Sequence, residues 1–246
     1  MTNLVLGGHS FIEQLGTDPA PDRVQAREIV QACLDQGVVR FDTTYAPERV
    51  ALGQALSHLG RRAEALVIAW NFFERFGPGE SVGGHAPFRP EHLQAMLDEL
   101  QTEWIDLLVV HPVDDASEQA RQQELAAGWL ADGKVRALGT WMPGHSVPRE
   151  PYSAAFAPYN AATPEAAAWF AGYRERGWET YATSPFVRGW ELDKRVAASG
   201  RSKADEADMM LRYAAFAPDV DYLIVSMRRV EWVAANVASW GRGPVD

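Results

Sequence analysis

The chain has 246 residues, of which 47% are hydrophobic, and a formal net charge of −10. This length and composition fit one domain with a large core, and the negative charge argues against nucleic acid or an anionic membrane as the main partner, because phosphate surfaces attract cationic proteins. Cys33 is the single cysteine, so an internal disulfide is excluded. Residues 1–10 show no signal-peptide pattern, and no apolar run is long enough to span a membrane. We therefore expect a cytoplasmic protein.

Short apolar runs alternate with helical patterns from one end of the chain to the other. Eight strands are expected, over residues 4–8, 39–43, 66–70, 106–110, 135–140, 154–157, 178–183 and 222–226. Helices are expected between them, over residues 22–36, 48–59, 90–100, 117–131, 164–176, 203–217 and 230–238. Near-continuous apolar strands separated by helices are typical of a parallel sheet. The eight repeats predict an α/β fold, a single-domain (β/α)8 TIM barrel over residues 1–246.

Two connections are longer than the rest. They cover residues 72–89 and 184–202, and both follow the carboxyl end of an expected strand. Barrels of this class build their active sites from such connections, and long loops inside a compact domain are commonly functional. We therefore expect a functional site at this end of the barrel.

One segment carries a family resemblance. Residues Arg40–Tyr45 (RFDTTY), followed by Glu48 and by Leu52 and Gly53, resemble the second-strand signature of the aldo/keto reductases. Four further segments in the right order strengthen the resemblance along the whole chain: 104–111, ending on His111, 133–139, 184–189, and the positions Arg228 and Asn236. In that family an aspartate, a tyrosine, a lysine and a histidine converge at the barrel mouth. The resemblance implies Asp42, Tyr45 and His111 as three of the four.

The fourth member of this tetrad is missing, because Asn71 stands where the family has its lysine. A cation about 4 Å from the tyrosine, at an effective dielectric constant near 20, is worth roughly 4 kcal/mol, or about 3 pKa units. Neutral Asn71 supplies none of this, so Tyr45 would remain a weak acid. Tyr45 also lies closer to Asp42 in sequence than the family pattern has it.

The residues that the family uses to hold nicotinamide are also replaced. Trp141 and Met142 stand where a serine and an asparagine would be, Phe156 replaces a glutamine, and Thr183 replaces the stacking tyrosine. A carboxamide buried against such side chains would lose hydrogen bonds at roughly 1–3 kcal/mol each. Ordinary hydride transfer is therefore not expected.

The remaining groups suit proton transfer next to a carbonyl. Without its cation, a partly buried Asp42 should have a raised pKa, useful for general acid/base catalysis, with His111 nearby and with Tyr45 or Asn71 able to hydrogen-bond an oxyanion. Aromatic side chains should form a wall for a flat or apolar ligand: Trp70, Trp141, Phe156 and Phe186. Met142 is expected in the same wall, and His9 at the same mouth.

A phosphate anchor is expected on the last two strand-to-helix connections. The candidate residues are Ser184, Arg188, Lys194, Arg228, Arg229 and Asn236. They would hold the phosphate part of NADP(H) or another phosphorylated ligand, or they are solvated surface charges. No spacing of histidine, cysteine and carboxylate residues indicates a metal site.

Three functions remain open from the sequence. The first is an enzyme without nicotinamide, which acts on a small carbonyl or hydroxyl compound by acid/base chemistry of the lyase, isomerase or dehydratase type. The second is an NADP(H)-dependent oxidoreductase with a weakened tetrad. The third is an inactive ligand-binding barrel. A small-molecule substrate and no nucleic acid or membrane partner are expected; the resemblance implies a monomer, although the sequence does not fix the oligomeric state.

Overall fold

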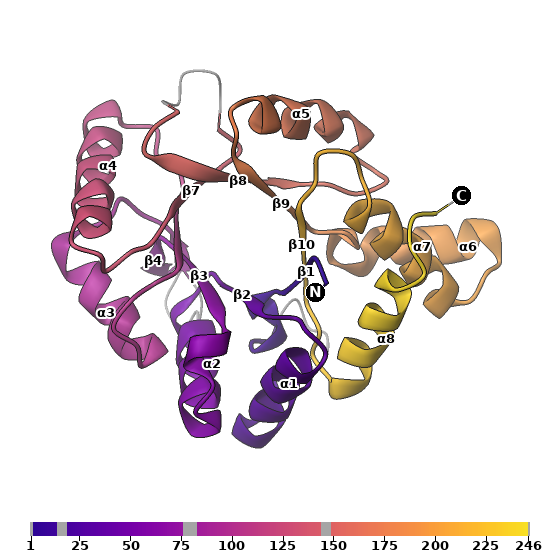
Figure 1. Ribbon diagram of the computed structural model, residues 1–246. Helices are drawn as coiled ribbons and strands as arrows, with labels where there is room; N and C mark the ends of the chain where they lie inside the picture. Colours follow the sequence, from indigo (N-terminus) through magenta and orange to yellow (C-terminus); the bar gives the residue numbers. More distant parts are fainter. Residues whose placement is uncertain (1, 14–18, 76–82, 144–148, 246) are drawn as a thin grey trace.

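Eight parallel strands close into a barrel in the computed structural model, which describes residues 2–13, 19–75, 83–143 and 149–245 (Figure 1). Their bounds, in order around the barrel, are β1 Leu4–Leu6, β2 Arg40–Thr43, β3 Leu66–Trp70, β6 Leu107–Val110, β7 Leu138–Trp141, β8 Tyr152–Pro158, β9 Glu179–Thr183 and β10 Tyr222–Val225. The register is parallel at every pairing, with β10 returning to β1. The predicted (β/α)8 barrel is confirmed.

Helices surround the barrel on its outside (Figure 1). Their bounds are α1 Arg23–Asp35, α2 Ala46–Leu59, α3 Pro90–Leu100, α4 Ala116–Ala131, α5 Ala167–Glu175, α6 Trp190–Ser199, α7 Lys203–Ala215 and α8 Val230–Trp240. The cap that the sequence suggests for α1 is present, because Asp22 Oδ1 accepts the backbone N–H groups of Val24 and Gln25. Gly37, just beyond this helix, has a φ of 79°, a conformation that glycine adopts without strain.

The two long connections contain structure that the sequence did not indicate. Residues after β3 form an antiparallel hairpin of β4 Phe72–Arg75 and β5 Gly83–His85. Residues after β9 form a short 3-10 turn, Val187–Gly189, and then α6. The helix expected over 164–176 begins as a 3-10 turn, Pro164–Ala166, before α5. The loops were thus placed correctly, but a hairpin and a helix within them were missed.

The barrel interior is a packed core. Side chains at alternate positions of the strands point inward and form one apolar cluster that includes Ile68, Trp70, Val109 and Phe156. A separate and larger cluster fills the space between the strands and the helices. Among the inward positions, Arg40 at the start of β2 donates hydrogen bonds of 2.7 Å to the hydroxyls of Tyr181 and Tyr222.

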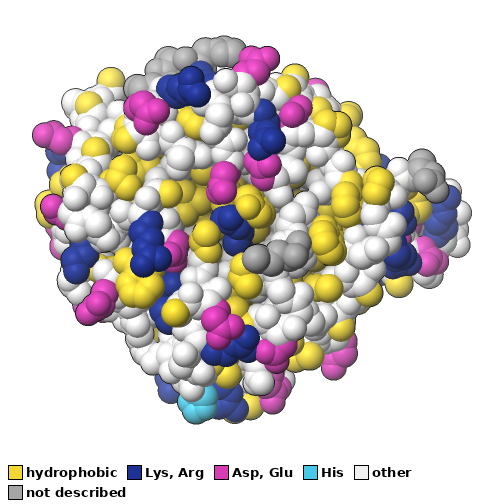
Figure 2. Space-filling model, in the orientation of Figure 1, with side chains coloured by type: hydrophobic (Ala, Val, Ile, Leu, Met, Phe, Trp, Pro, Cys, Tyr) yellow, Lys and Arg dark blue, Asp and Glu magenta, His cyan; other side chains and the backbone are white. Residues whose placement is uncertain are grey.

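The surface carries both signs of charge. Figure 2 shows acidic and basic side chains interspersed with hydrophobic ones over the face seen in Figure 1. Within the described ranges, no helix is both long enough and apolar enough to cross a bilayer. The same ranges contain no cluster of three histidine, cysteine or acidic residues able to hold a metal ion.

Candidate functional site

Five rings form a row along the carboxyl ends of consecutive strands. His9 follows β1, Tyr45 follows β2, Phe72 follows β3, His111 follows β6, and Trp141 ends β7. Their ring centroids are 5.5, 5.6, 5.5 and 6.1 Å apart in that order. We call these five residues the ring row. Each of the five side chains is partly exposed.

Asp42 lies below this row and is 5% exposed. Its Oδ1 accepts a hydrogen bond of 2.6 Å from the indole Nε1 of Trp70, which is also 5% exposed. Burial raises the pKa of Asp42 to about 7, and the indole N–H opposes this only in part. The indole of Trp70 therefore lies directly beside the Asp42 carboxylate. The raised pKa agrees with the expectation from the sequence, although the carboxylate is enclosed.

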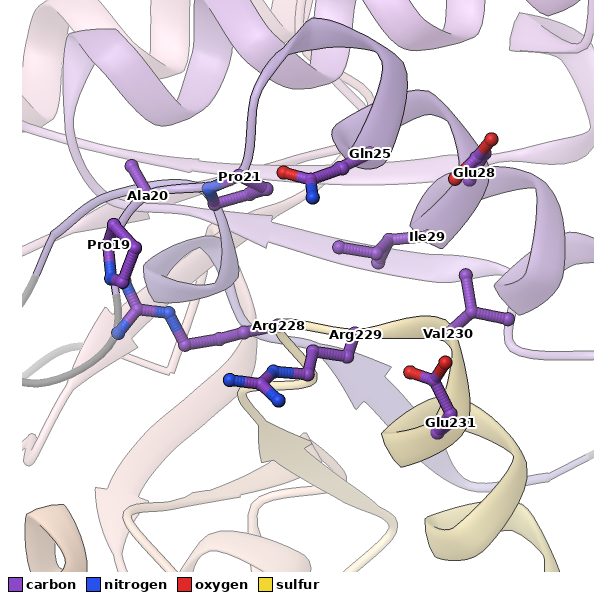
Figure 3. Close-up of a pocket in the computed structure, with 10 residues that line it drawn as sticks. All are labelled: Pro19, Ala20, Pro21, Gln25, Glu28, Ile29, Arg228, Arg229, Val230 and Glu231. Carbon is purple, nitrogen blue, oxygen red and sulfur yellow. The ribbon is translucent and has the colours of Figure 1, made fainter.

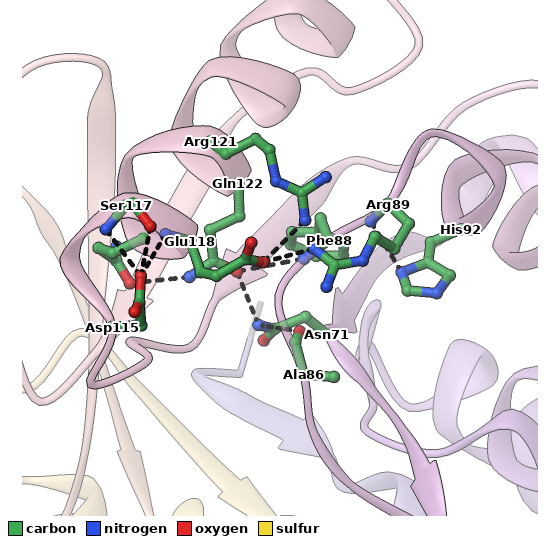
Figure 4. A network of polar contacts seen from close by, with 11 residues as sticks. Asn71, Ala86, Phe88, Arg89, His92, Asp115, Ser117, Glu118, Arg121 and Gln122 are labelled. Atoms are coloured by element: carbon green, nitrogen blue, oxygen red, sulfur yellow. Dashed lines mark hydrogen bonds and ion pairs between the residues drawn. The ribbon is translucent and has the colours of Figure 1, made fainter.

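Asn71 does not face Asp42, which corrects the expectation that it binds an oxyanion. Its Nδ2 lies 2.9 Å from the Ala86 carbonyl and 3.1 Å from the Gln122 Oε1 (Figure 4). The same Nδ2 lies 3.2 Å from the His111 carbonyl, and its Oδ1 accepts the N–H of His111. Because side chains alternate along a strand, Trp70 points into the barrel and Asn71 points toward α4. Asn71 therefore supports the strand end that carries His111.

His111 is half-buried between Phe72 and Trp141 in the ring row, and one contact defines its tautomer. Its Nδ1 lies 3.0 Å from the carbonyl of Pro112, and a carbonyl can only accept, so Nδ1 carries the proton. Burial lowers the pKa of His111, the bond to Pro112 opposes this, and His85, stacked at 3.8 Å, adds to the lowering. The imidazole is thus neutral near pH 7, with a lone pair on Nε2.

Tyr45 is the N-cap residue of α2 and lies between His9 and Phe72. Phe72 touches both Tyr45 and His111, in edge-on contacts of 86° and 82° between ring planes. Tyr45 and Asp42 are joined through the backbone of the connection between β2 and α2 and not through a lysine. The structure therefore brings Tyr45, His111 and His9 to one rim, as expected, with Asp42 below it.

The expected aromatic wall is only partly present. Trp70, Phe156 and Trp141 do gather, with centroids 5.0 and 5.6 Å from the Trp70 ring. Phe156 is fully buried and Trp70 nearly so, however, which makes them core residues of the barrel. Phe186 packs against the cluster between strands and helices, so placing it in this wall was wrong. Trp141 and the exposed Met142 are the members that reach the surface.

A pocket of ≈ 420 Å³ lies between the start of α1 and the start of α8 (Figure 3). Arg228 and Arg229 line it, together with Gln25 and the acidic Glu28 and Glu231. The side chain of Arg228 extends toward Pro19 and donates to the carbonyl of Ile12 (Figure 3). Two guanidinium groups beside the amino end of an eleven-residue helix make this a place where an anion could bind.

The other expected phosphate residues do not converge on this pocket. Ser184 is exposed on the connection after β9, and Asn236 lies half-buried further along α8. Lys194 is exposed on α6 and lies 3.8 Å from Glu191. The side chain of Arg188 lies outside the part of the chain that the structure describes.

Four site residues were missed in the sequence. Phe72 and His85 belong to the hairpin, which was expected to be a loop. Gln122, fully buried on α4, donates to the His111 carbonyl at 3.1 Å. Glu48 was noted only as part of a motif, yet it is fully buried and lies 3.4 Å from His9. The alternation of side chains along β3 could have indicated that Trp70, and not Asn71, faces Asp42. No pattern in the sequence indicates that a glutamate at the start of a helix, such as Glu48, is buried beside a histidine.

Comparisons with known proteins agree with this fold. No family model matches the chain. A 6-dehydroglucose reductase from Agrobacterium fabrum is 27% identical over 141 residues, which is 50% of this chain and 44% of that protein. The match therefore spans less than half the length of this relative.

Solved structures match over nearly the whole chain. The holo form of the aldo-keto reductase AKR11C1 from Bacillus halodurans has a TM-score of 0.77 at 20% identity, covering 99% of this chain and 88% of that one. The glycerol dehydrogenase AKR11B4 from Gluconobacter oxydans has a TM-score of 0.76 at 18% identity, covering 99% and 88%. An aldo/keto reductase from Klebsiella pneumoniae in complex with NADP and acetate has 0.71 at 18%, covering 96% and 85%. The fold that the resemblance to the aldo/keto reductases implies is confirmed, because this chain has their fold.

The side chains at the mouth do not fit a nicotinamide ring held as that fold would hold it. Phe156 is so close below Gly139 that a Cβ there would lie 2.8 Å from its ring. Trp141 and Met142 present no amide or hydroxyl group for a carboxamide, and Asp42 already accepts the indole N–H of Trp70. The arginine pocket, in contrast, offers two guanidinium groups to a phosphate group, beside the carboxylates of Glu28 and Glu231.

Proposed function

We propose that the protein is an enzyme of the aldo/keto reductase fold that acts on a small carbonyl or hydroxyl compound by proton transfer. The observation that carries the proposal is the hydrogen bond from His111 to the Pro112 carbonyl, because it places the ring proton on Nδ1 and leaves Nε2 as the basic nitrogen of the neutral imidazole that burial favours. Asp42 is hydrogen-bonded to the indole of Trp70 and not to a lysine of the kind that the aldo/keto reductases use to lower the pKa of their tyrosine.

The reaction that these groups favour begins at a carbon next to a carbonyl. Nε2 of His111 takes the proton from that carbon, and the C–H electron pair moves into a carbon–carbon double bond. The carbonyl oxygen receives a proton from a donor at the mouth, such as the hydroxyl of Tyr45. Where that carbon bears a hydroxyl, the hydroxyl loses its proton and the former carbonyl carbon gains one, which gives an isomer. Where a β-hydroxyl is present, it leaves as water with the proton held by His111, which gives a dehydrated product.

Solvent exchange tests this proposal without a named substrate. The protein is incubated with dihydroxyacetone or glyceraldehyde in D2O, and the signal of the protons next to the carbonyl is followed by NMR. We expect exchange well above the protein-free rate, loss of at least about a hundredfold in His111→Gln, and full activity in His58→Gln, an exposed control. Equal rates in the wild type and His111→Gln would remove His111 from this role.

A second candidate function is NADP(H)-dependent oxidoreduction. The arginine pocket favours it, as do the relatives, one named a reductase and one determined with NADP. Residual binding of the phosphate portion fits Arg228 and Arg229, with Glu28 and Glu231 opposing it by their charge.

Titration of NADPH against tryptophan fluorescence tests the second candidate. If it holds, quenching saturates and weakens at least about tenfold in Arg229→Ala, while Arg121→Ala on α4 binds as the wild type does. Oxidation of NADPH by the same carbonyl probes must accompany the binding. Quenching without oxidation leaves the proton-transfer proposal in place, and absence of both excludes the second candidate.

A further inference from the structure

Glu48 is a buried carboxylate that the proposed mechanism has not used. It lies in the first turn of α2, is fully buried, and accepts the N–H groups of Thr44 and Tyr45 on Oε2, at 2.6 and 3.3 Å. These contacts cap the helix and engage only one of its two oxygens. The other oxygen, Oε1, lies 3.4 Å from Nδ1 of His9.

The backbone at His9 is arranged to allow this approach. A Cβ on Gly8 would lie 2.1 Å from Oε2 of Glu48, so only glycine leaves room for the carboxylate. The short 3-10 turn that carries His9 is held by Ser10, whose hydroxyl donates to the Gly7 carbonyl at 2.7 Å and accepts the N–H of Met227 at 2.8 Å. The His9 ring is therefore presented from a fixed turn, with 28% of its side chain exposed beside Tyr45.

We propose that Glu48 is a positioning residue that orients His9 as a second proton-transfer group of the barrel mouth. The carboxylate faces Nδ1, which directs the other ring nitrogen, Nε2, to the donor or acceptor role. A carboxylate that orients an imidazole also stabilises its protonated form. His9 and His111 then lie at two separated places in the ring row, with Tyr45 and Phe72 between them.

Charged groups on β2 and α2 act on Glu48. Asp42 on β2 faces Glu48 and adds to the effect of burial, which raises the pKa of Glu48 to about 8. Arg49 on α2 lowers it, but its guanidinium is directed to Glu99 at 2.6 Å and the Thr44 carbonyl at 3.0 Å. Beyond these, Tyr45 lies against the His9 ring, and Arg228 donates to Ile12 on the connection that follows His9.

The pair of Glu48 and His9 supplies the general acid of the proposed reaction. As Nε2 of His111 removes the carbon-bound proton, the protonated His9 donates its proton to the carbonyl oxygen, and the enol forms without net charge. The reverse transfers regenerate the carbonyl and both imidazoles. This role rests on the proposed function, whereas the coupling of Glu48 to His9 does not.

The coupling is tested by NMR titration of the histidine rings, with the His9 signal assigned from its loss in His9→Gln. We expect a His9 pKa above 6.5 in the wild type, a fall of about one unit or more in Glu48→Gln, and no change in Glu99→Gln, which removes the partner of Arg49 instead. An unchanged His9 pKa in Glu48→Gln would overturn the inference. If Glu48→Gln does not fold, a wild-type His9 that is already neutral at pH 6.5 overturns it as well.

The catalytic part is tested by the pH profile of deuterium exchange into dihydroxyacetone. In Glu48→Gln we expect kcat to fall about tenfold or more with little change in KM, and the alkaline limb to move to lower pH along with the His9 titration. A parallel loss at all pH values would indicate a structural role only and would overturn the inference. Absence of exchange in the wild type would refute the proposed function, while the titration still decides the coupling.

Discussion

Asp42 and Glu48 are two buried carboxylates on the same side of the barrel. Burial destabilises the charge of both, but their surroundings compensate for it in different ways. Both have pKa values raised by burial. Asp42 lies inside the barrel and receives one indole N–H, whereas Glu48 lies at the rim and receives two backbone N–H groups and faces an imidazole. The carboxylate of Asp42 is therefore enclosed in the core, whereas the carboxylate of Glu48 lies next to the partly exposed ring of His9.

The comparison teaches that burial alone does not decide what a carboxylate can do. Through the indole of Trp70, Asp42 is linked to the hydrophobic core of the barrel. The chemistry that remains accessible lies along the ring row, on residues from the connections after β1, β2 and β6.

The largest effect is expected in the pH dependence of stability. The pKa of Asp42 is about 7 in the folded protein against an ordinary value of 3.8 for an exposed aspartate, so the native state binds more protons than the unfolded state between these values. The stabilising contribution is therefore complete below about pH 4 and is lost as the pH rises through about 7, by roughly 4 kcal/mol for this group. Urea unfolding should show that the free energy of unfolding depends less on pH in Asp42→Asn than in the wild type. The same pH dependence in both proteins would contradict a raised pKa of Asp42.

Gly8→Ala is expected to destabilise the fold by about 3 kcal/mol. The added Cβ would lie 2.1 Å from Oε2 of Glu48 and 2.7 Å from the carbonyl of Asp42, so the turn or the carboxylate must move. Gly128→Ala on α4 is the matched control, because no atom lies within 4 Å of its Cβ and alanine favours a helix. Thermal or urea unfolding measures both, and equal stability of the two variants would refute the close contact.

Trp70→Phe separates the indole N–H from the rest of the ring. It should cost about 2 kcal/mol at pH 8, where Asp42 is ionised, and less at pH 5, where a proton on the carboxyl removes most of the demand for a donor. Trp178→Phe is the control, since its N–H donates to a backbone carbonyl that does not titrate. If Trp70→Phe lowers the free energy of unfolding equally at pH 5 and pH 8, the hydrogen bond to Asp42 is not the source of the destabilisation.

The smallest effect on activity is expected from Asn71→Lys, which restores the lysine of the family at its sequence position. Because Asn71 faces Ala86, His111 and Gln122, an ammonium group there would not reach Asp42. Oxidation of NADPH by dihydroxyacetone should remain at background, with circular dichroism as the check of folding. Clear NADPH-dependent turnover would show that the reductase site is nearly intact.

Much of the fold could be predicted from the sequence because each strand is a short apolar run and each helix has its own end signals. β3 and α3 have the predicted bounds, and Asp22 caps α1 as expected. The hairpin β4–β5 and helix α6 were missed because both lie in connections where few apolar residues define a period.

The site was less predictable, because function there depends on which way each side chain points. Tyr45, His111 and His9 could be placed by the rule that strands of a barrel end at the same mouth. Motif alignment put Asn71 in the lysine position, but strand alternation turned it outward and brought Trp70 to Asp42. Glu48 reaches His9 only because Gly8 leaves room for it, a contact that no local pattern encodes.

One NMR experiment tests the central claim most directly. The protein is mixed with dihydroxyacetone and NADPH in D2O, and proton and hydride transfer are read from the same spectra. Proton transfer predicts deuterium beside the carbonyl, lost in His111→Gln, with NADPH unchanged. Glycerol carrying protium delivered from NADPH, with no deuterium in the remaining dihydroxyacetone, would contradict the account.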